Sequence, residues 1–504
     1  MREGTAENRR GVLLKRSIER QPQVKTPQAT LWGRRGKASP GEELPVEPRP
    51  AVESRPAAGP APTSRRRVLN FYDAYKFAFG TIWVFTFTLY MRPNDLLPIG
   101  TFPVAKIIAI VALFAYINAQ MNANQPLINR TTEAKMVYVL LLLAIFFIPA
   151  AASPTDSINM LNETFSKVVI IFVMMASVIS TRERLESIIR LTVICGAILA
   201  FFAIKSYAMG SFDLRGIRIV GLVKGIFENP NDLATALCML FPLAIVLMLN
   251  RKGFKRFFYL GCVLVIVLGI FATFSRGGFL GVFAVCLFMA WKFGGKRRVP
   301  NLIGAAILLV GILMVLPGGY RNRVVTIFNS DQDETGSAQA RTELLHRGIE
   351  VFMRRPIVGV GMGNFHIFSV HEHVAHNGYV EIAAELGIFG LLAYLTIIIK
   401  PFRRLLRVEK DLKGSTTDSD RWLRYLNIGL QAQLVAYIVT SFFLSIEYLW
   451  YLYYAAAYAI VLQQIHLNER AKEPVLESPA LPVEDQSKAL ALRPKKNEGA
   501  LWSS

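Results

Sequence analysis

One histidine in this sequence lies where proton-transfer chemistry at a membrane surface is possible. His376 ends a polar segment and is followed at once by an apolar stretch, 378 to 400, long enough to span a bilayer. A histidine titrates close enough to neutral pH to accept or donate a proton there. Glu381 and Glu385 follow one helical turn apart, so either could orient the imidazole or cap a helix. We predict that His376 moves a proton, with a structural histidine as the alternative.

Arg276 is predicted to bind an anion close to the same surface. It lies in a short polar turn between two apolar runs. An arginine at membrane depth is costly, so it is usually paired, functional or extended toward lipid phosphates. Gly277 and Gly278 leave the backbone open for a ligand to approach, and the planar guanidinium suits a diphosphate better than lysine would. Contact with lipid phosphate alone is the alternative.

Two more arginines are candidates for the same anion, and a third is expected to support the site. Arg215 and Arg218 precede a loop that ends at a predicted helix cap, Asn231 or Asp232. Arg341 lies in the long segment that separates two predicted spans. A solvated loop with a cap explains the first two arginines equally well.

Two segments have spacings known from metal sites. The histidines other than His466 share one part of the chain and are His346, His366, His371, His373 and His376. His371 and His373 have the spacing of a zinc-ligand pair, but no second ligand cluster follows. Asp331 and Asp333 have the spacing with which some glycosyltransferases hold a divalent cation, in a polar segment that is expected to be solvated. We therefore predict neither a metal nor a cofactor.

Composition indicates a polytopic membrane protein. Of 504 residues, 53% are hydrophobic and only 18% are charged, and the mean hydropathy is +0.36, which excludes an ordinary soluble protein. The net charge of +21 gathers in short segments between apolar runs and in the N-terminal tail. Membrane orientation explains that charge better than nucleic-acid binding. The four cysteines lie in or beside apolar runs and suggest no disulfide framework.

About twelve apolar stretches are predicted to span the membrane as helices, which gives an all-α fold. They lie near 74–91, 102–119, 135–152, 164–180, 186–208, 232–250, 257–274, 277–293, 299–317, 378–400, 427–445 and 447–466. We divide the chain into a disordered basic tail, N-terminal spans, a catalytic region, C-terminal spans and a second disordered tail. Their ranges are 1–67, 68–208, 209–400, 401–470 and 471–504. The tail before residue 68 lacks a signal-peptide pattern, so the first span is expected to direct insertion.

Positive charge sets the predicted orientation. With both termini in the cytoplasm, four groups of basic residues fall on the cytoplasmic side, at 182–184, 251–256, 296–298 and 403–413. The connections at 92–101, 209–231, near 275 and 318–377 then lie outside. The candidate arginines and His376 consequently reach one membrane surface from three separate parts of the chain.

The joint order of these motifs resembles the O-antigen ligase and polymerase superfamily. The resemblance covers about 200 to 400 and includes Arg218, Gly221 and Arg341. Its motifs are Phe227-Glu228-Asn229-Pro230-Asn231, Thr273-Phe274-Ser275-Arg276-Gly277-Gly278, the segment 355–365 and the segment 376–390.

The resemblance implies an integral glycosyltransferase of the bacterial inner membrane that acts at the periplasmic face. The donor would be a glycan on undecaprenyl diphosphate, and the acceptor a hydroxyl of lipid A-core or of another glycan. By this resemblance Arg218 and Arg276 would bind the diphosphate, with Arg215 in place of Arg218 as an alternative, and His376 would be the base. Direct displacement would invert the anomeric centre without a metal. The helix after His376 favours a ligase over a polymerase, and a multi-helix transporter is the alternative from another class.

Overall fold

The computed structural model describes residues 64–93, 104–211, 227–315, 337–369, 373–415 and 417–471. Every regular element within these ranges is a helix, which confirms the all-α class. Several predicted features lie outside the described residues: most of both tails, Arg215, Arg218, His371 and the segment 331–334.

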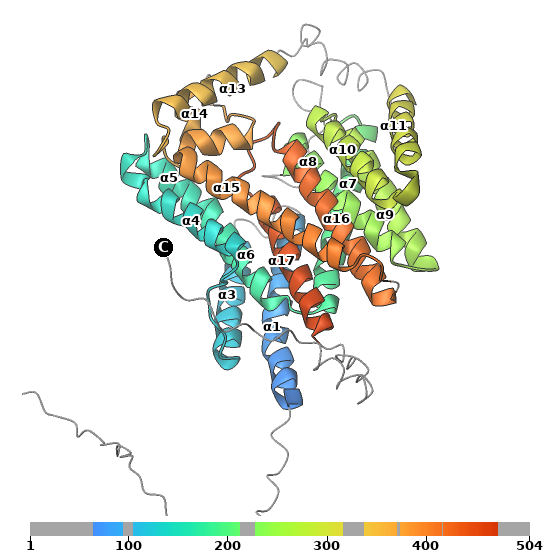
Figure 1. Ribbon diagram of the computed structural model, residues 1–504. Helices are drawn as coiled ribbons and strands as arrows, with labels where there is room; N and C mark the ends of the chain where they lie inside the picture. The colour runs from blue at the N-terminus through green and yellow to red at the C-terminus, as the bar shows by residue number, and fades with distance from the viewer. Residues whose placement is uncertain are drawn as a thin grey trace, which may run out of the picture. The chain divides into compact units, whose positions relative to one another are not determined.

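Most of the described residues belong to long helices (Figure 1). The N-terminal helices are α1 (Ser64–Met91), α3 (Val104–Asn122), α4 (Thr132–Phe146), α5 (Pro154–Met160), α6 (Ser166–Val178) and α7 (Arg182–Ala208). The central helices are α8 (Pro230–Leu249), α9 (Phe254–Ala272), α10 (Arg276–Phe293), α11 (Arg298–Val315), α13 (Ser337–Arg354) and α14 (Phe365–Phe368). The C-terminal helices are α15 (Gly378–Asp411), α16 (Asp418–Thr440) and α17 (Trp450–Arg470).

The protein is a multi-pass membrane protein. Seven helical segments of the described chain are long and apolar enough to cross a bilayer. They are Val104–Asn122, Pro154–Val178, Arg182–Ala208, Pro230–Leu249, Phe254–Ala272, Arg276–Phe293 and Gly378–Asp411. The other five predicted spans coincide with α1, α4, α11, α16 and α17. The total of twelve stays a prediction.

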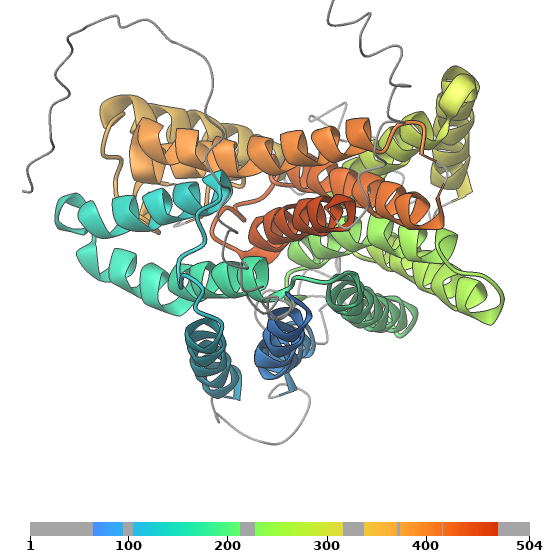
Figure 2. The ribbon, with the colours of Figure 1, turned by 60° about the horizontal axis from the view of Figure 1, so that its bottom comes forward.

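Two buried helices organise the packing. α17 contacts α15, α6 and α16, and its buried face includes Ala455, Ala456 and Ala457, whose small side chains let neighbouring helices approach closely. α8 packs on α9, α16 and α10. Figure 2 shows α15 running beside α16 and α17 along much of its length.

The cap predicted for α8 was wrong. Asn229, rather than Asn231 or Asp232, is the N-cap, and its side chain accepts from the backbone N–H of Asn231 at 2.9 Å. The reason is Pro230, which occupies the first helical position, where a residue without an N–H is favoured.

The connection predicted as a long loop, 318 to 377, contains structure. α13 lies within it as an amphipathic helix that buries Leu344 and Val351. α13 packs closely on the start of α15. The helices are so close that a side chain at Gly348 would collide with the side chain of Val380. α13 therefore lies beside the first turn of α15 (Figure 1).

Candidate functional site

The predicted catalytic histidine lies in a tight turn that begins α15. His376 has a backbone φ of 53°, a left-handed conformation that is uncommon for residues other than glycine. The next residue, Asn377, is the N-cap, and its side chain accepts from the N–H groups of Tyr379 and Val380 at 3.1 and 3.2 Å. The cap fixes where the helix begins and holds the half-buried imidazole in the turn just before it.

The turn is attached to the segment that joins α16 to α17, residues 441–449, which we call the 441–449 loop. The N–H of Gly378 donates to the carbonyls of Ser441 and Leu444, both at 2.9 Å. A Cβ atom on Gly378 would lie 2.9 Å from Oε2 of Glu447. The loop backbone and the side chain of Glu447 therefore both pack closely on Gly378, and a larger residue here would displace the carboxyl group.

The Arg276 turn meets the same loop from another side. Arg276 is the first residue of α10, after the N-cap Ser275, whose Oγ accepts from the N–H of Gly278 at 3.2 Å. A Cβ atom on Gly277 would lie 3.4 Å from Cβ of Phe443 in the 441–449 loop. This loop therefore contacts both the turn that carries Arg276 and the turn that carries His376.

Arg276 was predicted either to bind an anion or only to contact lipid phosphates, and its burial helps to choose between these roles. Its exposed fraction is 9%, so protein encloses most of the side chain. An arginine that only reached for lipid headgroups would be expected to keep its charged group exposed. This burial favours a role inside the protein.

The prediction that two glycines leave the backbone beside Arg276 open was wrong. A Cβ atom on Gly278 would lie 2.9 Å from Cβ of Ala234 in α8, and Gly277 faces Phe443. These glycines permit close packing of α10 on its neighbours, as small residues do in membrane proteins.

Glu381 supports the segment immediately before His376. Its Oε2 accepts from the N–H of Ala375 at 2.9 Å and also from the hydroxyl of Ser445 in the 441–449 loop. The carboxylate thereby ties the residue preceding His376 to the loop.

Glu385 supports a different element. Its two oxygens accept from the N–H of Gly363 at 2.8 Å and the N–H of Phe365 at 3.0 Å, and Tyr448 donates its hydroxyl at 2.9 Å. Phe365 is the first residue of α14, so Glu385 caps that helix from a distance. Glu385 was predicted either to orient the His376 imidazole or to cap a helix, and the structure shows it capping α14.

A kink in α15 allows a glycine-rich segment, residues 359–363, to dock against it. Gly387 has a φ of 66° inside the helix, which interrupts the regular hydrogen bonding. The freed carbonyls of Ala384 and Glu385 accept instead from Val360 and Gly361 at 3.0 and 2.9 Å. A side chain at position 387 would collide with the carbonyl of Ile357, so the kink also depends on glycine.

Other predicted residues lie farther from the described contacts. Arg341 is half-buried near the start of α13, about two turns before the point where that helix meets α15. His373 is exposed, while His371, Arg215 and Arg218 lie outside the described residues. The described parts of the chain contain no group of three potential metal ligands.

Sequence reasoning missed the 441–449 loop and its buried acid. Glu447 is 2% exposed, and its Oε2 has no hydrogen-bond partner within the described ranges. The predicted spans 427–445 and 447–466 left only one residue for this connection. The signal was present, because Ser441, Ser445 and Glu447 interrupt an apolar run in which polar residues are costly.

The long apolar helices define a multi-pass membrane protein. Hydrogen-bonded polar side chains gather at the beginning of α15. Residues 260–395 match the family model described as O-antigen ligase. This match includes α10 and the His376 turn, and it confirms the resemblance to the O-antigen ligase superfamily.

A curated relative supports the same family. The chain is 29% identical over 239 residues to the teichuronic acid biosynthesis protein TuaE of Bacillus subtilis (strain 168). The similarity covers 43% of this chain and 46% of the relative, so it spans about half the length of each.

Proposed function

We propose that this protein is a membrane glycosyltransferase that moves a glycan from undecaprenyl diphosphate to an acceptor hydroxyl. The observation that carries the proposal is the attachment of both the Arg276 turn and the His376 turn to the 441–449 loop. A cation for the diphosphate and a base for the acceptor are the two groups that this transfer needs.

The proposed reaction is a direct displacement. The acceptor oxygen attacks the anomeric carbon and gives its proton to His376, while the bond from that carbon to the diphosphate oxygen breaks. Arg276 stabilises the charge on the leaving diphosphate, together with Arg218 or Arg215. The anomeric centre is inverted, and the inventory of residues needs no metal, since the diphosphate is already a good leaving group.

The proposed orientation follows from the distribution of positive charge. The His376 and Arg276 turns face the periplasm, both termini lie in the cytoplasm, and the protein resides in the bacterial inner membrane. Arg341 supports the site from α13, and Glu381 and Glu385 support it from α15.

The acceptor distinguishes two candidate functions. We favour a ligase that transfers the glycan to lipid A-core, because the match covers the domain described as O-antigen ligase. A polymerase that extends a glycan is the second candidate, since the relative is named for teichuronic acid biosynthesis rather than for ligation.

Purified protein supplied with a carrier-linked repeat unit, alone and then with lipid A-core, tests this proposal. We expect no ladder from the carrier alone and one new band when the acceptor is added. A regular ladder without acceptor would identify a polymerase. No product in either case, with solute uptake into vesicles instead, would contradict glycosyl transfer and favour a transporter.

A further inference from the structure

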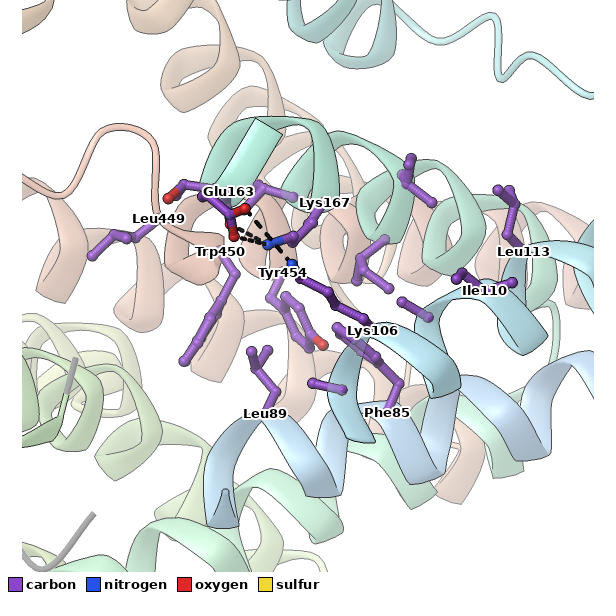
Figure 3. A pocket seen from close by; sticks show the side chains of 16 residues that line it. Phe85, Leu89, Lys106, Ile110, Leu113, Glu163, Lys167, Leu449, Trp450 and Tyr454 are labelled. Carbon is purple, nitrogen blue, oxygen red and sulfur yellow. Dashed lines mark hydrogen bonds and ion pairs between the residues drawn. The ribbon is translucent and has the colours of Figure 1, made fainter. Parts of the chain in front are cut away.

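A groove with apolar walls has a volume of about 470 Å³ (Figure 3). It is bounded by residues of α1, α3 and α6, by Glu163 and Thr164 just before α6, by the beginning of α17 and by Leu449 at the end of the 441–449 loop. Phe85, Leu89, Leu113, Ile171 and Tyr454 are among its apolar lining residues. Its volume falls within the range of about 300–1,000 Å³ that is usual for ligand sites.

The polar groups of the groove gather in one place. Figure 3 shows Lys106 and Lys167 converging on Glu163 beside the apolar wall. Nζ of Lys167 lies 3.0 Å from Oε2 of Glu163, and Nζ of Lys106 lies 3.7 Å from Oε1. Two cations and one carboxylate leave a single excess positive charge. The side chains of Lys106 and Lys167 are 59% and 38% exposed, so their ammonium groups can be reached from outside.

The two lysines of this cluster lie on α3 and α6, whereas Arg276 lies on α10, although the groove also touches Leu449 of the 441–449 loop. Arg276 begins α10, which packs mainly on α8, α11 and α16. Trp450, which lines the groove, also packs against Tyr90 and Phe227 with ring centroids 5.6 and 5.8 Å away. Through these rings the groove adjoins Phe227, close to the start of α8. The charge of its lysines, rather than its place in the fold, therefore distinguishes it from the proposed diphosphate site.

We propose that this groove binds one anionic phospholipid of the surrounding membrane. Its phosphodiester lies between Lys106 and Lys167, and one of its acyl chains follows the apolar wall. The single negative charge of a phosphodiester matches the single excess positive charge of the cluster. Glu163 draws the two lysines together and opposes the phosphate at close range, so it limits the affinity of the site.

Lipid binding to the full-length protein in detergent, measured by native mass spectrometry, tests this proposal. We expect one phosphatidylglycerol to bind more tightly than phosphatidylcholine with the same acyl chains. Lys106→Gln and Lys167→Gln should each weaken phosphatidylglycerol binding by about fivefold, the contribution of one lysine near an anionic lipid. Lys135→Gln, which changes an exposed lysine on α4, is the matched control and should change nothing.

Three further variants distinguish the proposal from a simple surface ion-pair cluster. Glu163→Gln should tighten phosphatidylglycerol binding, since it removes the competing charge. Ala109→Trp should weaken binding by filling the groove, with the lysines intact. A double Lys106→Arg, Lys167→Arg variant should retain binding, which separates loss of charge from loss of folding.

Several results would overturn the proposal. Unchanged phosphatidylglycerol binding in the double Lys106→Gln, Lys167→Gln variant would do so. Displacement of the phospholipid by undecaprenyl phosphate with the same lysine dependence would assign the groove to the donor, and a dimer that blocks lipid binding would assign it to a second copy. The assay contains no glycan, so its outcome is independent of the proposed transfer reaction.

Discussion

The two ends of α15 bind carboxylates in opposite ways. Near its end, Arg404 binds Glu133 of α4 through two contacts at 2.6 and 2.9 Å, and Lys292 of α10 lies 2.7 Å from Glu409. Near its beginning, Glu381 and Glu385 instead accept from backbone N–H groups and from the hydroxyls of Ser445 and Tyr448.

The carboxylates near the end of α15 join helices to one another, whereas those near its beginning position the backbone around His376. Ion pairs at the far end join α15 to other helices, and a buried pair is sensitive to the loss of either partner. Neutral donors at the near end leave the carboxylates to fix the backbone on both sides of His376.

The largest expected effect is on transfer at the near end. His376→Ala should lower the rate by about 10²–10⁴-fold, the contribution of a general base, because it removes the proton acceptor. Carrier binding should stay largely intact, since the base acts on the acceptor. Transfer assays with donor-binding controls measure both quantities, and full activity in a correctly inserted variant would remove His376 from the mechanism.

Transfer activity of the unaltered protein should also survive a strong chelator.

Arg276→Lys is expected to have the next largest effect. Lysine keeps the charge but loses the two-pronged geometry, so we expect the transfer rate to fall roughly a hundredfold, as for loss of one preorganised electrostatic contact. Arg403→Lys, an exposed basic position on α15, provides the control and should leave the rate unchanged. Near-normal rates in Arg276→Lys would indicate that Arg276 only contacts lipid.

At the far end, the expected effect is on stability. Glu133→Gln leaves the guanidinium of Arg404 partly buried without its counter-charge, which should cost about 3–5 kcal/mol of folding free energy. Thermal unfolding in detergent should show a large fall in Tm. Transfer per folded molecule should be preserved, and an unchanged Tm would mean that the pair does not fasten these helices.

The smallest effects compare the two near-end acids. Both donors to Glu381 use Oε2, so the single amide oxygen of Glu381→Gln can replace it at a cost of about 1 kcal/mol or less. Glu385 uses both oxygens, so Glu385→Gln would turn an NH₂ group toward an N–H donor. We expect the lower Tm in Glu385→Gln. Equal Tm values would show that these bonds contribute little.

Sequence patterns predicted much of the helical framework, while the placement of His376 and Arg276 at one membrane surface stays a prediction. They could not predict the 441–449 loop as their common support, because Gly378 meets Ser441 and Leu444 through backbone groups that carry no sequence signature. The kink at Gly387 was also missed, since a glycine in an apolar run is compatible with a continuous helix. Long-range packing decides both features.

Cysteine labelling from outside the cell most directly tests the claim that the His376 end of α15 faces the periplasm. Ala340→Cys on α13 and Lys410→Cys near the end of α15 both change exposed positions, and a variant lacking Cys195, Cys238, Cys262 and Cys286 provides the background. A membrane-impermeant maleimide should label the cysteine at 340 and should label the cysteine at 410 only after the cells are opened. Labelling at 410 in intact cells, with none at 340, would contradict the orientation on which the proposed site depends.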